Sequence, residues 1–369
     1  MPVTAAATRT SPSSAHRALT GADLSRLRAR SRRRPRAVLA VLGLTLLGAM
    51  AVRVLLGTYT VTIPDFLTIL GGGTVDAAPA ASFIVMEDKL PHAVLGALAG
   101  LAFGTAGAVF QLLLRNPLAS PDVIGISASA SLGAIASAAF FGAAGLGLAA
   151  GGLIGAGLAA VAVFLLSVSG RAASGPGAGE AVGGRFILTG LGISVLAIAV
   201  TNYLLSRMSV YQAADAAIWL TGSLGASSWQ RIGLTGAALI ALLPLLALLS
   251  RPLHAMAVGE ELAAGLGVPV TAVRWLGIGL ATALAAVAVS MTGPIAFVAF
   301  VSGPVARRLV GGGHTLVGSA LVGAILVVLA DFTAANLIPG GRLPVGVITG
   351  LIGAPVLLWL VAGEHKERT

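Results

Sequence analysis

Long apolar runs, separated by short stretches that contain charges, glycine or proline, dominate this chain. A helix needs about 20 apolar residues to cross roughly 30 Å of hydrocarbon. Ten runs come close to that length, although the third and eighth are short and interrupted by glycine or proline. We therefore predict an all-α polytopic membrane protein with about ten transmembrane helices. The expected spans are 37–57, 91–111, 123–142, 146–167, 186–206, 232–250, 272–291, 293–310, 314–335 and 344–362.

The composition identifies lipid as the main solvent. Only 10% of the residues are charged and 57% are hydrophobic, whereas a soluble domain carries roughly 25% charged residues. The absence of cysteine excludes disulfides, iron–sulfur clusters and thiolate zinc sites. Gly96, Gly100 and Gly104 share one helical face in the second span, which predicts a close approach between two helices.

Positive charge gathers ahead of the first span. Residues 1–36 contain nine arginines and one acid, Asp23, and have no apolar period. We interpret them as a basic, disordered cytoplasmic tail, because basic residues next to a span favour the inner side and argue against a nucleic-acid site. A secretory signal cut near Ala49-Met50-Ala51 is the alternative. Basic residues are more frequent after even-numbered spans, so the C-terminal residues 364–369 are also expected in the cytoplasm.

Several kinds of chemistry are missing. A phosphate-binding ATPase loop needs a Gly-Lys pair, and neither Lys89 nor Lys366 follows a glycine. The histidines lack metal-ligand spacing, and no catalytic triad or carboxylate pair is evident. We therefore expect no catalytic residue, no metal site and no cofactor bound by this chain. Asp331 alone lies deep in an apolar run, where it either bonds a neighbouring helix or lines a pathway.

The second span closes on a run that ends a helix sharply. Two prolines and an asparagine follow a basic residue that would anchor the turn at the cytoplasmic surface. The residues that define this cytoplasmic turn motif are Gln111, Arg115, Asn116, Pro117 and Pro121.

The loop between the sixth and seventh spans, about 254–270, has helical character. Two acids suit the first turn of a helix, and two glycines suit a stop and reversal. We predict two short helices that lie flat on the membrane face and form a binding surface for a soluble partner. The residues assigned to this segment are Gly259, Glu260, Glu261, Leu266, Gly267 and Val268.

The last span is opened and interrupted by proline and glycine. Such residues free backbone carbonyls, which is tolerated where a helix is buried in protein or lines a cavity. We therefore predict a pathway wall or packing face that contains Pro344, Gly346, Gly350, Gly353 and Pro355.

Together these motifs resemble the FecCD/BtuC-type permeases of ABC importers for iron–siderophores, haem and vitamin B12. The resemblance covers about residues 40–362 and rests on Arg115-Asn-Pro-Leu-Ala-x-Pro121, the 259–268 segment and the Leu343–Pro355 region. It implies a type II importer fold with a permease domain over 37–363, in a bacterial cell membrane. It also implies a second permease copy or paralogue, an extracytoplasmic substrate-binding protein and two ATPase subunits that hold ATP-Mg and drive alternating access through the 259–268 segment.

Two positions depart from the family pattern. Relatives usually open the second span with Arg-x-Pro-Arg, which helps to grip acidic groups of the binding protein, and Lys89 and His92 stand there instead. By the resemblance these two are expected to take the docking role. The eighth span carries Gly303-Pro304 where relatives commonly have Pro-His, which suggests one member of a heterodimeric pair.

The expected function is the permease of a ferric-siderophore ABC importer, with no enzymatic activity of its own. Cobalamin and haem remain alternative substrates, because no residue here reads the substrate. An ion- or proton-coupled secondary transporter is the alternative from another class, disfavoured by the shortage of buried carboxylates. A membrane-embedded enzyme would need convergent polar groups that the sequence does not provide.

Overall fold

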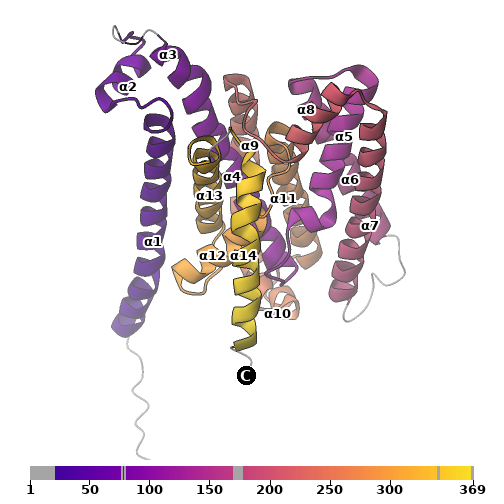
Figure 1. The fold of residues 1–369 in the computed structure, drawn as a ribbon. Coiled ribbons are helices and arrows are strands. Elements are labelled where there is room, and N and C mark those ends of the chain that lie inside the picture. Colours follow the sequence, from indigo (N-terminus) through magenta and orange to yellow (C-terminus); the bar gives the residue numbers. More distant parts are fainter. Residues whose placement is uncertain (1–20, 76–77, 79, 169–177, 339–340, 367–369) are drawn as a thin grey trace, which may run out of the picture.

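Residues 21–75, 78, 80–168, 178–338 and 341–366 are described in the computed structural model, and all regular structure in this part of the chain is helical (Figure 1). The elements are α1 (Gly21–Leu55), α2 (Ile63–Leu70), α3 (Ala81–Phe83), η1 (Ile84–Lys89), α4 (Leu90–Leu113), η2 (Pro121–Ile124), α5 (Ile126–Phe141), α6 (Leu146–Val168), α7 (Ala178–Arg207), α8 (Val210–Leu220), α9 (Trp229–Val258), α10 (Glu260–Gly265), α11 (Val270–Thr292), α12 (Val298–Val310), α13 (Leu316–Asn336) and α14 (Val345–Lys366).

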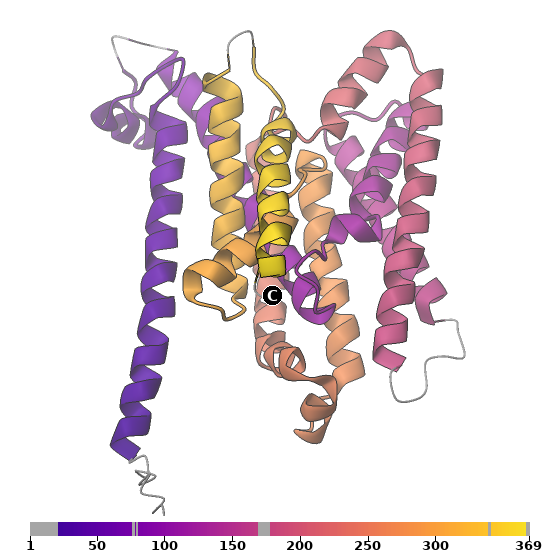
Figure 2. The same cartoon turned by 60° about the horizontal axis from the view of Figure 1, so that its bottom comes forward.

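The long helices stand roughly side by side and leave two ends (Figure 1). One end, called here the α10 end, holds α10, the start of α1 and the end of α14. The opposite end, called the α8 end, holds the short helices α2, α3 and α8. Figure 2 shows the α10 end turned forward, with α10 projecting below its neighbours.

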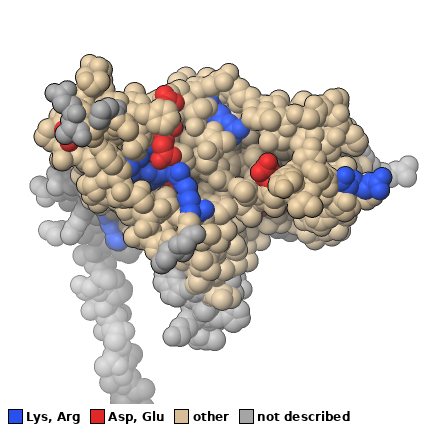
Figure 3. Space-filling view, turned by 45° about the horizontal axis from the view of Figure 1, so that its top comes forward, with Lys and Arg blue, Asp and Glu red and all other residues tan. Residues whose placement is uncertain are grey.

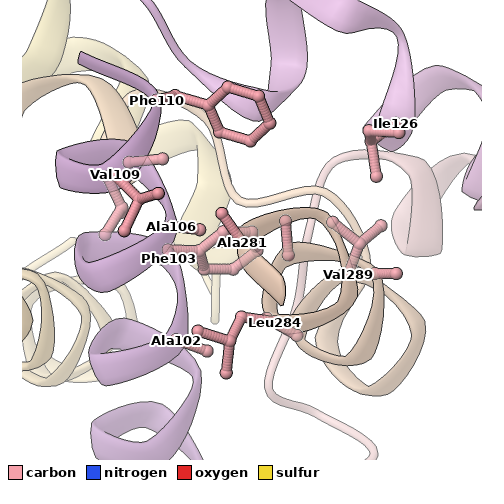
Figure 4. Close-up of a cluster of buried hydrophobic side chains, with 14 of the residues drawn as sticks. Ala102, Phe103, Ala106, Val109, Phe110, Ile126, Ala281, Leu284 and Val289 are labelled. Carbon is pink, nitrogen blue, oxygen red and sulfur yellow. The ribbon is translucent and has the colours of Figure 1, made fainter. Parts of the chain in front are cut away.

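Helix α4 forms the centre of the bundle. Nearly all of its residues are buried, and it packs against α9, α11, α12 and α13. Phe103 and Phe110 of α4 meet Leu284 and Val289 of α11 in a continuous apolar core (Figure 4). A helix that is hydrophobic all round is buried inside a large or membrane-embedded protein, and α4 has this character.

The glycine face of α4 packs against α13, which confirms the predicted close approach of two helices. A Cβ built on Gly100 would lie 2.5 Å from the Cα of Ala324, and one on Gly104 would lie 2.9 Å from the carbonyl carbon of Ser319. Real Cβ atoms essentially never come this close to other heavy atoms. The two backbones therefore touch only because side chains are absent.

Ten helices of 13 residues or more occupy the ten predicted span positions in the described chain. Seven of them are long and apolar enough to cross a membrane by themselves, and α5 is a shorter apolar helix. Helix α14 has 22 residues, and its stretch Val345–Leu358 is apolar. Helix α12 has only 13 residues because the predicted span 293–310 becomes helical only at Val298. Gly293 and Phe297 adopt positive φ of 71° and 64° ahead of it, so a non-helical turn replaces the start of that span.

The structure differs from the predicted irregular tail. Helix α1 begins at Gly21, so residues 21–36 are helical, while residues 1–20 lie outside the described residues. The reason is local: Arg, Ala and Leu, which dominate 21–34, are among the best helix formers. Pro35 lies inside the helix without ending it.

Candidate functional site

The segment between α9 and α11 projects from the α10 end. Helix α9 runs without interruption through Pro252 to Val258, and Gly259 joins it to α10. The prediction of two short helices was therefore wrong in one respect, because the first of them is the end of α9. Gly267 follows α10 with a φ of 82°, a left-handed conformation that favours glycine. It turns the chain back toward α11, as the sequence predicts.

One residue of α10 ties the helix to the bundle. Ala263 is fully buried, and its carbonyl accepts hydrogen bonds from the N–H groups of Leu266 (3.2 Å) and Val268 (3.0 Å). These bonds close the C-terminal end of α10, where a helix leaves carbonyls unpaired. The short helix is thus held as a folded unit.

Three charged side chains join the cytoplasmic turn motif to α10. Glu260 forms ion pairs with Arg274 of α11 and, at 3.9 Å, with Arg115 after α4. Arg115, in a left-handed conformation with a φ of 47°, also donates a hydrogen bond from Nη2 to the carbonyl of Met256 (3.1 Å). Two motifs that lie about 145 residues apart in the sequence therefore meet at one cluster, and α10 is linked to α4, α9 and α11.

The rest of the turn motif shapes the chain after α4. Gln111 is buried and donates from Nε2 to the carbonyl of Phe300 (2.9 Å). A Cβ on Gly303 would collide with the Gln111 side-chain amide, so glycine at that position has a packing reason. Asn116 accepts the N–H of Leu118 (2.8 Å) in a side-chain-capped turn that contains Pro117, and Pro121 begins η2.

The outer surface of this segment is apolar with one acid. Val258, Leu262 and Leu266 are 78%, 62% and 76% exposed, and Glu261 is exposed between them. We call this surface the α10 face. Apolar side chains gathered around a charge on a projecting element are typical of a protein–protein contact.

The α8 end corrects the docking prediction for Lys89 and His92. Lys89 is 4% exposed, and its Nζ donates to the carbonyls of Val54 (3.0 Å), Leu56 (2.9 Å) and Tyr59. These carbonyls lie at and beyond the C-terminus of α1, where a cation is favoured. His92 is 3% exposed, and its Nδ1 lies 2.6 Å from the Asp88 carbonyl. Both residues hold the fold together and offer no free surface.

Several exposed charges of the α8 end lie nearby. Arg342 Nη1 pairs with Asp88 Oδ1 at 3.1 Å, with each side chain about two-fifths exposed. Glu87 is exposed next to them. Figure 3 shows the few charged side chains of this end in an otherwise uncharged surface.

Asp331 forms a buried ion pair. Its Oδ2 lies 2.5 Å from Nε of Arg53, and the two side chains are 6% and 3% exposed. The pair connects α13 to α1. The helix-to-helix bond expected for Asp331 is therefore present, and its partner is charged.

Helix α14 uses its glycines for close contacts. A Cβ on Gly353 would lie 2.5 Å from Cγ of Phe297, and one on Gly346 would lie 2.9 Å from the carbonyl carbon of Thr221. Gly350 has open space around it, and Pro355 lies inside the helix. Pro344 precedes the helix and accepts the N–H of Val347 (3.2 Å). Gly346 and Gly353 thus serve packing.

Sequence reasoning missed two arginines and one apolar surface. Arg53 and Arg274 complete the ion pairs of Asp331 and Glu260, and Arg53 could have been found as the one cation inside the first apolar run. No feature of the sequence indicated that Val258 and Leu262 are exposed, because apolar residues occur throughout this chain. Within the described residues, no group of three or more His, Asp or Glu side chains could hold a metal ion.

Comparison with known proteins gives one family. The model of the FecCD transport family matches residues 44–363. The Fe(3+)-citrate import system permease protein YfmE of Bacillus subtilis (strain 168) is 32% identical over 341 residues, which cover 92% of this chain and 98% of that protein. The ferric enterobactin transport system permease protein FepG of Escherichia coli (strain K12) is 33% identical and covers 79% of this chain and 86% of its own.

Two further similarities agree. The vitamin B12 import system permease protein BtuC of Vibrio parahaemolyticus serotype O3:K6 (strain RIMD 2210633) is 32% identical, over 80% of this chain and 89% of its own. A solved inward-facing structure of a metal-chelate type ABC transporter superposes with a TM-score of 0.75 at 26% identity, covering 89% of this chain and 99% of that chain. The family-model match and the length of these alignments show that the chain belongs to the FecCD transport family.

Proposed function

We propose that this protein is the membrane-spanning permease of an ATP-binding-cassette importer that moves ferric-siderophore complexes by alternating access. The observation that carries the proposal is the α10 face: a short helix, tied to three long helices through Glu260, that projects from one end with Leu262 and Leu266 exposed. An element built in this way can transmit a movement of a soluble partner to the helix bundle.

The partners follow from the family. Two ATPase subunits, each binding ATP-Mg, would dock on the α10 faces of two permease copies or paralogues. A substrate-binding protein would dock at the α8 end, where Glu87, Asp88 and Arg342 are among the exposed charges. This chain itself would bind no cofactor and hydrolyse no nucleotide.

The orientation proposal uses the ends of the bundle. All ten long helices would cross the membrane of a bacterial cell, and the α10 end would face the cytoplasm with both termini. The basic residues Arg115, Arg251 and Arg274 lie in the segments of that end, which agrees with the positive-inside rule. The short α5 and α12 would cross with help from the non-helical segments before them, shielded by protein.

The substrate assignment rests on relatives. YfmE and FepG are named for ferric citrate and ferric enterobactin, and BtuC for vitamin B12. Iron chelates therefore come first, with cobalamin and haem as the other candidates within the family.

An ion- or proton-coupled transporter is the competing function. Such a protein needs titratable groups inside the membrane. Asp331, the carboxylate found deep within an apolar run, is paired with Arg53, which favours a structural role. This observation supports an external energy source.

The test is reconstitution of the chain in liposomes with the ATPase and the binding protein encoded beside it. We expect uptake of a ferric siderophore that requires ATP and both partners and survives an uncoupler. Equal uptake without the ATPase, abolished by an uncoupler, would favour the competing function. A panel of ferric siderophores, haem and cobalamin in the same assay identifies the substrate.

A further inference from the structure

An apolar groove of about 540 Å³ lies on the bundle between α1, α4, α9 and α13. Its apolar lining includes Leu39, Leu101, Leu243, Ala247 and Leu321. Ala247 and Val317 of the lining are exposed, so the groove opens on the outer surface of the helices. At this depth the surface of a membrane protein meets lipid chains.

The groove has the length of one leaflet. Its lining on α9 runs from Leu243 to His254, which is about 16 Å at 1.5 Å per residue. The hydrocarbon core of a bilayer is roughly 30 Å thick. In the membrane orientation proposed above, the groove would extend from near the middle of the membrane to the α10 end, which is the reach of a single acyl chain.

The mouth of the groove at the α10 end is polar. His254 places Nε2 2.9 Å from the carbonyl of His314 and Nδ1 2.6 Å from the carbonyl of Ser250. Both contacts tie the His254 ring to backbone carbonyls, which only accept hydrogen bonds. The mouth is therefore lined by polar groups of His254, His314 and Ser250.

Two arginines lie beside the loop that joins α12 to α13 and leads to His314. Nη1 of Arg307 lies 3.2 Å from Nε2 of His314. Burial, followed by the positive charge of Arg307 and by the nearby His254, lowers the pKa of His314. This shift favours the neutral ring, whose Nε2 can accept a hydrogen bond from Arg307. The guanidinium of Arg34 packs against Gly311, where a Cβ would lie 3.3 Å from Cζ.

We propose that this groove binds one anionic phospholipid from the leaflet on the α10 side, with an acyl chain along α9 and α13 and its phosphate at Arg34 and Arg307. Basic pockets between transmembrane helices are known places for anionic head groups. Charge complementarity selects the anionic class, because the choline group of a zwitterionic lipid would bring a further positive charge next to Arg34 and Arg307. The bound lipid would brace the end of α9 immediately before α10.

Native mass spectrometry of the purified full chain tests this proposal. The protein in detergent is offered equal amounts of phosphatidylglycerol and phosphatidylcholine with identical acyl chains. We expect one tightly retained phosphatidylglycerol, at least fivefold above phosphatidylcholine. In Arg34→Gln with Arg307→Gln this preference should disappear. The matched control, Arg185→Gln with Arg207→Gln, removes two exposed arginines of α7 away from the groove and should keep it.

A second variant tests the part of the groove that would hold the acyl chain, without changing any charge. Ala247→Phe fills the groove from an exposed position, so it should fold normally and lose the retained lipid. Equal retention of the two lipids by the unmodified chain would overturn the proposal. So would full retention by Ala247→Phe, or equal losses in the two arginine double variants.

Discussion

The buried Arg53–Asp331 pair permits a prediction that separates structure from transport chemistry. Asp331→Asn would leave Arg53, 3% exposed, without its counter-charge inside the membrane. Its Nη2 already has no hydrogen-bond partner among the described residues, so the lost carboxylate would not be replaced locally. Removing one partner of a buried pair strands the other charge, which costs far more than the pair itself contributes.

The magnitude follows from the geometry. Two unit charges about 4 Å apart interact by roughly 4 kcal/mol at an effective dielectric constant of about 20. Breaking a buried pair in soluble proteins costs about 3–5 kcal/mol. Polar contacts between membrane helices contribute less to stability, because the helices of the unfolded state also find polar partners in the membrane. We therefore expect Asp331→Asn to lower the free energy of unfolding by about 3 kcal/mol. Arg53→Met with Asp331→Leu should come within about 1 kcal/mol of the unmodified protein.

The assay is a detergent titration of the purified permease, with unfolding followed by helical circular dichroism. Glu87→Gln, which removes an exposed carboxylate at the α8 end, is the control and should change stability by less than about 0.5 kcal/mol. The double variant should also retain ATP-driven uptake. An unchanged stability in Asp331→Asn, or a double variant as unstable as the single one, would refute a structural pair. A stable double variant without uptake would assign Asp331 a role in transport.

Two further predictions concern packing and coupling. Gly100→Leu should prevent recovery of folded protein because α4 and α13 touch there, while Gly157→Leu, with open space around it, should not; similar yields would contradict the close approach. Glu260→Gln should lower the free energy of unfolding by about 1 kcal/mol in the detergent titration, since its ion pairs are partly screened by solvent. Glu261→Lys should leave this free energy unchanged and weaken ATPase binding severalfold in a pull-down. The reverse pattern would mean that Glu260 faces the partner.

Much of the fold could be predicted from the lengths of the apolar runs alone. The predicted span 146–167 is α6, Leu146–Val168, and 272–291 lies within α11, because a membrane demands a helix wherever an apolar run is long enough. The spacing of Gly100 and Gly104 also predicted a contact face, because small residues at four-residue spacing let two helix backbones approach closely.

The candidate site could be read less completely. The short helix and the chain reversal of the 259–268 segment were predictable from its acids and glycines. Its projection and its attachment were not, because Arg274 and Arg115 reach Glu260 only after three helices pack. Lys89 shows the limit clearly. A lysine near a span end is ordinarily exposed, and only the carbonyls of Val54 and Leu56 in the folded chain make its burial favourable.

The most direct test of the central claim uses the absence of cysteine from this chain. In vesicles of known orientation, Leu262→Cys places one thiol on the α10 face, and Tyr211→Cys places one on α8, where the side chain is 86% exposed. The account predicts that a membrane-impermeant maleimide labels Leu262→Cys only from the cytoplasmic side and that bound ATPase blocks this reaction. Tyr211→Cys should react only from outside, with or without ATPase. Labelling of Leu262→Cys from outside, or at the same rate with the ATPase bound, would contradict the account.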